Sequence, residues 1–441
     1  MTDAVLGGAL AAEAAPGPHE PDLSPRRLRR RHAAERRFRL YGLAAILAAL
    51  AMLVLLLATI VGRGFTAFVV TEIALDVTFD ESVIDPAGRR ERDALAEADY
   101  RALVQAALLA RFPEASDRAR RRELLAMLGA DAPYALRDRV LAEPRSIGQT
   151  RRTWLKAASD IDGLAKGFVD RRLAEGDRRV SDRQLAWYDA LVADGSVARR
   201  FNSGFLTQAD SRAPEEAGIL GALVGSALTL AVTLALSFPL GVMAAIYLSL
   251  FAPKNRWTDL IEVNINNLAA VPSIVYGLLG LAVLLNTVGL PRSAPLAGGI
   301  VLALLTLPTI IIAARIAIEA VPPSIRAAAL ALGASPLQAA LHHIVPLAMP
   351  GILTGTIIGM ARALGESAPL LMIGMVAFVV DVPRGLTDAA TVLPVQIYLW
   401  ADAPERGFVE KTSGAIIILL VFLMTMNLVA ILLRKRFEQR W

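Results

Sequence analysis

Six long apolar runs alternate with polar segments along the chain. They cover residues 40–61, 219–250, 265–286, 296–318, 349–379 and 414–433. A run of about 18 or more apolar residues is long enough to cross the hydrocarbon core of a bilayer as a helix. The pattern therefore predicts an all-α integral membrane protein with six spanning helices.

The segment between the first two runs, residues 63–217, has a different pattern. It is rich in charge of both signs, and residues 68–79 alternate apolar and polar positions as a strand does. Residues 91–112 and 118–128 instead repeat apolar positions at helical spacing. The segment is long enough for a domain of its own, so we predict a mixed α/β domain between helices 1 and 2.

The residues before the first run divide into two parts. Residues 1–25 are rich in Ala, Pro, Gly and acids, whereas residues 26–39 contain eight arginines and one glutamate. We predict a disordered basic tail over 1–39 and a first membrane helix over 40–62. A secretory signal peptide is the alternative, but its apolar core would be only about 7–15 residues long. The run here is longer and ends at Arg63 with no cleavage signature, which favours a retained anchor.

Positive charge predicts how the helices are oriented. Basic residues crowd residues 26–39, the short loop at Lys254 and Arg256, and the end of the last run at Arg434-Lys435-Arg436. Short loops that are rich in Lys and Arg stay in the cytoplasm, whereas long loops escape this rule. We therefore expect both termini and residues 319–348 inside, and residues 63–217 and 380–413 outside.

Composition removes several functional classes. The net charge of +5 lies mainly beside the apolar runs, which argues against a nucleic-acid-binding protein. The chain has no cysteine, and its four histidines are not arranged as a metal cluster. The dipeptide Gly-Lys is absent, so the chain lacks a recognisable nucleotide-binding loop. We expect no metal and no bound cofactor, and any ATPase must be another chain.

The segment from about 319 to 348 is polar and rich in alanine. Gly333-Ala334-Ser335-Pro336 predicts that one helix stops and another starts: Gly ends the first, Ser caps the second, and Pro occupies its first turn. Such a hairpin could project as a knob toward a partner. An ordinary inside loop is the alternative, and the hairpin alone does not decide between them.

Arg362 and Glu366 are ionisable residues within an apolar run, four positions apart, so on a helix they face the same side. A charge at the bilayer centre costs about 2.5–3.5 kcal/mol on insertion scales, so such residues usually face a cavity or a partner. The planar donors of arginine match an oxyanion, and Glu366 would be its counter-charge. A static ion pair between helices is the alternative. Ser367 and Ser273 are further candidates in the substrate pathway.

Several stretches carry a resemblance to a known superfamily. The 319–348 segment resembles the cytoplasmic coupling loop of ABC-importer permeases, whose pattern is Glu-Ala-Ala, three residues, Gly, and a later hydrophobic-Pro pair. It appears here as Ala327-Ala328-Ala329, Gly333 and Val345-Pro346. Ala327 stands where the family has glutamate, so coupling would depend on shape and on neighbours such as Arg326.

Residues 361–371, ARALGESAPLL, and residues 271–277, VPSIVYG, resemble phosphate-specific permeases, in particular their A subunit. Residues 181–218 resemble an extra domain at the amino end of some of these subunits. The resemblance covers residues 218–441 well and residues 63–217 less specifically. It implies the type I ABC-importer permease fold and a subunit that does no covalent chemistry.

The same resemblance implies the partners: a homologous second permease, a dimer of ATP-binding subunits, an external phosphate-binding protein, and the lipid of a bacterial inner membrane. A permease for another oxyanion, molybdate or sulfate, remains open. So does a membrane sensor or scaffold protein, which would need no ATPase. A membrane enzyme built on residues 63–217 ranks last, because that segment has no nucleophile–base pair.

Overall fold

The computed structural model describes residues 25–437, in two units that divide after Thr59. The described part of the first unit is most of helix α1 (Pro25–Gly64), which ends in the second unit. Its Ala, Leu and Arg residues all favour helix. Residues 25–39 are therefore helical, and the prediction of disorder over 1–39 is wrong for them. The rest of that predicted tail, residues 1–24, lies outside the described residues.

In the second unit, residues 69–201 build a three-stranded antiparallel sheet. Strand β1 (Val69–Thr78) lies between β2 (Thr150–Lys156) and β3 (Val197–Phe201), with Leu75 opposite Thr153 and Ile73 opposite Val197. The alternation over residues 68–79 thus predicted a strand correctly. A short 3₁₀ turn, Phe65–Phe68, connects α1 to β1.

Helices surround this sheet and close a core of large apolar side chains. Phe79, Leu108, Leu136 and Leu155 are among its fully buried members. The helix predicted over residues 91–112 is two helices, because Ala98 has extended backbone and Asp99 caps the second helix. The helices around the sheet are α2 (Glu81–Ile84), α3 (Arg92–Glu97), α4 (Tyr100–Arg111), α5 (Arg118–Leu125), α6 (Ala132–Ala142), α7 (Ser159–Ala165) and α8 (Asp182–Ala193), with 3₁₀ turns at Pro144–Ser146 and Glu175–Asp177. Helix α9 (Ser203–Thr207) follows β3 and packs toward the membrane helices through Phe205.

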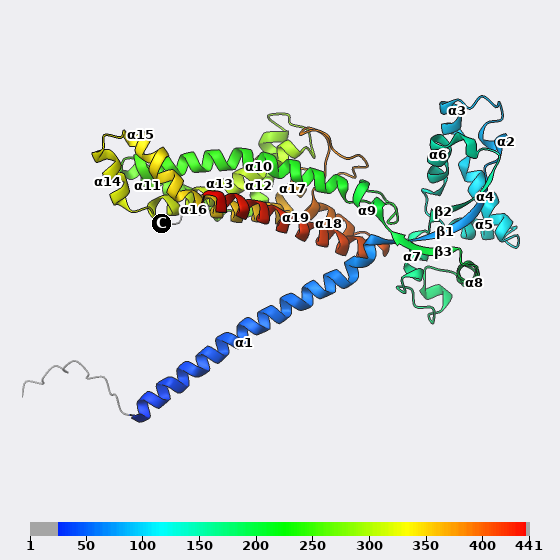
Figure 1. The fold of residues 1–441 in the computed structure, drawn as a ribbon, viewed down its shortest axis with the longest axis horizontal. Coiled ribbons are helices and arrows are strands. Elements are labelled where there is room, and N and C mark those ends of the chain that lie inside the picture. The colour runs from blue at the N-terminus through cyan, green and yellow to red at the C-terminus, as the bar shows by residue number, and fades with distance from the viewer. Residues whose placement is uncertain (1–24, 438–441) are drawn as a thin grey trace, which may run out of the picture. The chain divides into compact units, whose positions relative to one another are not determined.

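Within the described residues, five helices are long and apolar enough to cross a membrane, and a bent pair raises the number to six. Besides α1 they are α10 (Leu220–Ile246, continued by a π-helical turn at Tyr247–Phe251), α13 (Pro295–Glu319), α16 (Val345–Gly365) and α19 (Gly407–Phe437). Helix α13 packs between α10 and α16, and α19 packs on α16 (Figure 1).

The run predicted as one span over 265–286 is bent. Helix α11 (Arg256–Ala269) and helix α12 (Ser273–Leu279), which continues as a π-helical turn at Gly280–Leu285, meet at 102°. The break falls at Val271 and Pro272. Proline lacks a backbone N–H and excludes helical geometry from the residue before it.

The span predicted over 349–379 is also too long. Helix α16 ends at Gly365, a five-residue helix α17 (Ala368–Met372) follows, and residues 376–392 contain neither helix nor strand. Glu366 has extended backbone, and Pro369 has no backbone N–H that could bond to the Gly365 carbonyl oxygen. Helix α16 therefore does not continue past Gly365.

The loop predicted over 380–413 contains helix α18 (Leu393–Ala401) and the first turns of α19. Its aromatic-rich stretch, Leu393–Trp400, predicts from the sequence a segment at the membrane interface. Trp400 is instead buried, and it packs against Phe205 and stacks on Phe408. This cluster joins the segment before α10 to the membrane helices.

Candidate functional site

Arg362 and Glu366 form an ion pair at the end of α16. The Arg362 Nε lies 3.5 Å from the Glu366 Oε1, and the two side chains are 48% and 20% exposed. Arg362 occupies the last helical turn, whose dipole favours a cation. Glu366 follows the helix with extended backbone (φ −81°, ψ 119°). The expectation that both lie deep in one continuous helix is therefore wrong, although the pair itself is present.

The chain turns sharply after this pair. Ser367 precedes α17, and its carbonyl oxygen accepts hydrogen bonds from the backbone N–H groups of Leu370 and Leu371. No side-chain cap is made by Ser367. Its hydroxyl therefore plays no part in starting α17.

The two stretches that resemble phosphate-specific permeases in the membrane part, 271–277 and 361–371, lie against each other. A Cβ added to Gly277 of α12 would lie 2.6 Å from the Cα of Pro369, so only glycine allows this approach. Tyr276 donates a hydrogen bond to the Leu268 carbonyl oxygen (2.8 Å) and thereby fixes the bend between α11 and α12. Ser273 begins α12, and among the described residues no hydrogen bond joins it to Arg362 or Glu366.

A small cavity lies beside this site. It is lined by Ala363 and Leu364 among others, and its volume of about 10 Å³ is too small for an anion. The half-exposed Arg362 side chain therefore presents its donors on the outside of the helices of this chain.

The 319–348 segment forms the predicted hairpin. Helix α14 (Pro323–Ala331) ends before Gly333, whose φ of +88° is the left-handed conformation that glycine adopts freely. Ser335 then caps helix α15 (Pro336–Ala339) with a capping box completed by Gln338. A π-helical turn at Ala340–Ile344 leads into α16, where Pro346 lies in the first turn.

Arg326 anchors the hairpin, because its Nη2 donates to the Leu250 carbonyl oxygen (3.1 Å) at the end of α10. Ala327 and Ala328 are exposed, whereas Ala329 is buried. The hairpin also exposes four leucines, and Leu332 at the turn is 90% exposed. The others are Leu330, Leu337 and Leu341. An exposed apolar patch of this kind marks an interaction surface.

One ion pair was misjudged from the sequence. Arg315 and Glu319 are four positions apart near a helix end, from which the sequence predicts side chains that extend toward water. The Arg315 Nη2 instead lies 2.9 Å from the Glu262 Oε1 and joins α13 to α11, with Glu319 at 3.4 Å. The partner lies 53 positions away in sequence, so local spacing gave no signal of it.

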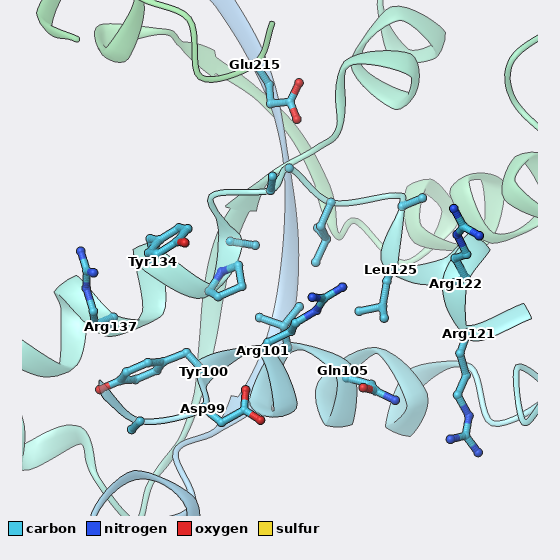
Figure 2. Close-up of a pocket in the computed structure, with 18 of the residues that line it drawn as sticks. Asp99, Tyr100, Arg101, Gln105, Arg121, Arg122, Leu125, Tyr134, Arg137 and Glu215 are labelled. Carbon is cyan, nitrogen blue, oxygen red and sulfur yellow. The ribbon is translucent and has the colours of Figure 1, made fainter. Parts of the chain in front are cut away.

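An open groove of about 1260 Å³ lies in the region of the sheet, between α4, α5 and α6. Figure 2 shows Tyr100, Tyr134 and Arg137 toward one end, Arg121 and Arg122 toward the other, and Arg101 between them. Burial raises the pKa of Glu215 at its edge, and the nearby carboxyls of Glu216 and Asp131 add to this. None of the site residues predicted from the sequence lines this groove.

Comparison with known families divides the chain. Residues 237–441 match the family described as binding-protein-dependent transport system inner membrane component. Residues 25–175 match a domain of unknown function, DUF3333.

Relatives agree with the first match. The chain is 32% identical over 217 residues to the phosphate transport system permease protein PstA 1 of Mycobacterium tuberculosis (strain CDC 1551 / Oshkosh), covering 49% of this chain and 70% of the relative. It is 34% identical over 167 residues to the probable ABC transporter permease protein YqgI of Bacillus subtilis (strain 168), covering 38% of this chain and 56% of that protein. Among solved structures, the MetNI methionine ABC transporter in inward-facing conformations matches at 19% identity and a TM-score of 0.40, over 49% of this chain and 97% of the other.

These matches define a class: the chain is a multi-pass inner-membrane permease of the ABC-transporter type. Within that class it belongs to the family of the PstA permease proteins, since it is 32% identical to a member and covers 70% of it. The segment with the three-stranded sheet, residues 69–207, is called the sheet region below. It lies outside the match to the transport family, and residues 69–175 of it fall within the domain of unknown function.

Proposed function

We propose that this chain is the transmembrane permease subunit of an ATP-driven importer of inorganic phosphate. The observation that best supports this proposal is Arg362, a half-exposed arginine within the matched transport segment. It belongs to the 361–371 stretch, which packs against the 271–277 stretch. Several relatives are named phosphate transport system permease proteins. The planar guanidinium group pairs well with a phosphate oxyanion.

The chain would supply half of a pathway. The cavity beside Ala363 and Leu364 has no room for an anion, whereas Arg362 is half exposed. A homologous second permease would cover that face and enclose the anion between the two chains. Ser367 and Ser273 contribute hydroxyl groups near this path, and Glu366 opposes the charge of Arg362 when no anion is bound.

Coupling to ATP hydrolysis uses the hairpin from 319 to 348. Its four exposed leucines around the rigid turn at Gly333 form a knob that fits an apolar cleft on an ATP-binding subunit. Since Ala327 is exposed and uncharged, the contact depends on shape and on the anchoring of the hairpin by Arg326. ATP is held by the partner dimer, so this chain is not itself an enzyme and needs no cofactor.

We further propose six spans of the type I importer fold, with the bent pair α11–α12 counted as one of them. Both termini and the hairpin are then cytoplasmic, and residues 63–217 form an external α/β domain on the side where a phosphate-binding protein docks. Reporter fusions at Gly195 and Gln338 test this orientation. They give opposite signals in the six-span arrangement, and equal signals would contradict it.

Phosphate uptake tests the function directly. Cells that lack this chain should lose high-affinity phosphate uptake and regain it when the chain is restored. A tenfold excess of sulfate or molybdate should leave the restored uptake unchanged. Competition by either anion would instead assign the chain to that oxyanion. Recovery without any ATP-binding partner would rule out an ABC importer.

A further inference from the structure

A second pocket lies where the sheet region meets the membrane helices, and no part of the proposed transport function uses it. Its volume is about 600 Å³. It is bounded by Arg63 at the end of α1, by α7, by the loop that contains Glu175–Asp177, and by the first turn of α19. In the six-span arrangement proposed above, two apolar helices enter or leave the membrane at the edge of this pocket, at the level of lipid headgroups.

One wall of this pocket is apolar and open. Phe168, Leu173 and Val409 are 52%, 46% and 57% exposed, although all three are large apolar residues. Several such side chains gathered in one concave site indicate an apolar ligand group that covers them.

A second group of lining residues is cationic and is called the cationic wall here; it includes Arg178, which has two donors without a partner within residues 25–437. The Arg178 side chain is 5% exposed and pairs with Asp182 through Nη2. Its Nε and Nη1 are buried, and no hydrogen-bond partner for either occurs in the described part of the chain. Buried guanidinium N–H groups without partners are costly, so an acceptor is expected to fill this position.

Three further arginines line the same pocket: Arg63, Arg179 and Arg406. Arg179 is held in place, because its Nη2 donates to the Pro404 carbonyl oxygen (3.0 Å). The cationic wall therefore combines elements far apart in sequence, as a built anion site does.

Four carboxylates also line the pocket: Asp160, Asp170, Asp177 and Glu410. Asp170 accepts from the Arg172 backbone N–H (2.9 Å), and the Glu410 Oε1 accepts from Lys166 Nζ (2.8 Å). Burial raises the pKa of Asp160, against the influence of Arg179 and Arg406. The capacity for an anion therefore rests on the Nε and Nη1 of Arg178, which have no partner among the described residues.

We propose that this pocket binds a phospholipid, whose phosphodiester pairs with Arg178 and the neighbouring arginines while its acyl chains cover Phe168, Leu173 and Val409. The amphiphile matches both walls, whereas a free phosphate ion would leave the apolar wall uncovered. The bound lipid would fasten the sheet region to the first turn of α19. This inference does not depend on which anion the permease carries.

Native mass spectrometry of the delipidated full chain in detergent tests the proposal. The probes are phosphatidylglycerol, diacylglycerol without a phosphate group, and inorganic phosphate. Phosphatidylglycerol should bind at one copy per chain, and the other two probes should not bind at the same concentration. Saturation by inorganic phosphate, or equal binding of diacylglycerol, would overturn the proposal.

Three variants assign the site. Arg178→Gln should weaken phosphatidylglycerol binding roughly tenfold, as expected for losing hydrogen bonds to a charged group. The matched control Arg172→Gln changes a neighbouring exposed arginine that does not line the pocket, and it should bind as the wild type does.

Arg178 is buried and paired, so its variant could fail to fold. Leu173→Asp changes an exposed position on the apolar wall and should also weaken lipid binding, because a carboxylate replaces a contact with the acyl chain. Wild-type binding by folded Leu173→Asp, or by folded Arg178→Gln, would refute the site.

Discussion

The sheet region and the membrane bundle are stabilised in different ways. In the sheet region, side chains cap five of the eight helices α2 to α9, and the core contains large side chains such as Phe79 and Leu108. The caps are Asp80, Asp99, Asp117, Ser181 and Asn202. Helices α10, α13 and α16 have no side-chain cap at their N-termini.

In the bundle, glycines at close helix contacts add to a core of large side chains such as Leu302 and Ile373. A Cβ on Gly299 of α13 would lie 2.4 Å from the Val232 Cβ of α10, and one on Gly355 of α16 would lie 2.2 Å from the Ala313 Cβ of α13. Lipid is as apolar as a leucine side chain, so burying large residues gives membrane helices little advantage. Close backbone approach and dispersion contacts stabilise them instead. Removing a large buried side chain is therefore the test for the sheet region, and adding a methyl group at a close helix contact is the test for the bundle.

The largest effect on folding is expected in the sheet region from removing volume. Phe79→Ala should lower the free energy of unfolding by about 3–5 kcal/mol, because the fully buried ring leaves a cavity. Hydrogen exchange of peptides from β1 and β2 in the full chain measures this. The matched control Phe201→Ala removes a ring that is 64% exposed and should change exchange little. Equal effects of the two would show that this core is not organised around large side chains.

In the bundle, adding volume should be harmful. Gly299→Ala should destabilise the packing of α10 on α13 by about 1–3 kcal/mol, since Val232 and the Thr229 carbonyl oxygen occupy the space of the new methyl group. Thermal unfolding in detergent, followed by exchange in α13, checks this. Gly359→Ala is the control, because its Cβ would meet only Ile310 at 3.6 Å, an ordinary contact. A Gly299→Ala protein as stable as the Gly359→Ala protein would contradict the role of close helix approach.

At Gly333, backbone conformation and not lack of space restricts which residues fit. Nothing lies within 4 Å of a Cβ at this position, but its φ is +88°. Gly333→Leu should strain the hairpin by about 1–2 kcal/mol, the usual cost of the left-handed conformation. Phosphate uptake should then fall relative to ATP hydrolysis in the reconstituted complex, because the leucine knob is displaced.

Gly333→Asn is the matched control, since asparagine tolerates the left-handed region. Uptake should be largely kept in this variant. Normal uptake and normal stimulated hydrolysis in Gly333→Leu would show that the turn has no part in coupling.

The sequence predicts local features of this chain well. Its apolar runs located the membrane helices, and the alternation over 68–79 located β1. The order Gly333, Ser335, Pro336 predicted the hairpin turn, because each residue acts on its own backbone neighbours. These predictions succeeded where the deciding interactions lie within a few residues.

The predictions that failed depend on backbone breaks at proline or on contacts between distant segments. The bend of 102° at Pro272 and the end of α16 at Gly365 each interrupt one of the apolar runs. Hydropathy indicates burial in lipid but contains no information on a change of helix direction. The contact of Arg315 with Glu262 and the pocket beside Arg178 each join distant segments, so no local pattern announced them.

The smallest effect on folding is expected at the ion pair of α16. Arg362 is half exposed and lies 3.5 Å from Glu366, a geometry for which removing the charges changes stability by about 0–1 kcal/mol. Transport should respond very differently. Arg362→Gln should abolish uptake, because the charge that draws an anion out of water is lost. Glu366→Gln should impair uptake, because the arginine is then unopposed and retains the anion.

The double variant Arg362→Gln/Glu366→Gln decides between a structural pair and an anion site. If the pair only joins the end of α16 to the following turn, removing both charges together should restore uptake, because a neutral pair replaces an ion pair at little cost. If Arg362 contacts the anion, the double variant should assemble normally and transport nothing. The pair of Arg315 and Glu262, at 2.9 Å, is the matched control, because it joins α13 to α11 away from the proposed path. Its double neutral variant should keep uptake, since only packing is involved. Wild-type uptake by the assembled Arg362→Gln/Glu366→Gln protein would show that Arg362 does not handle the anion.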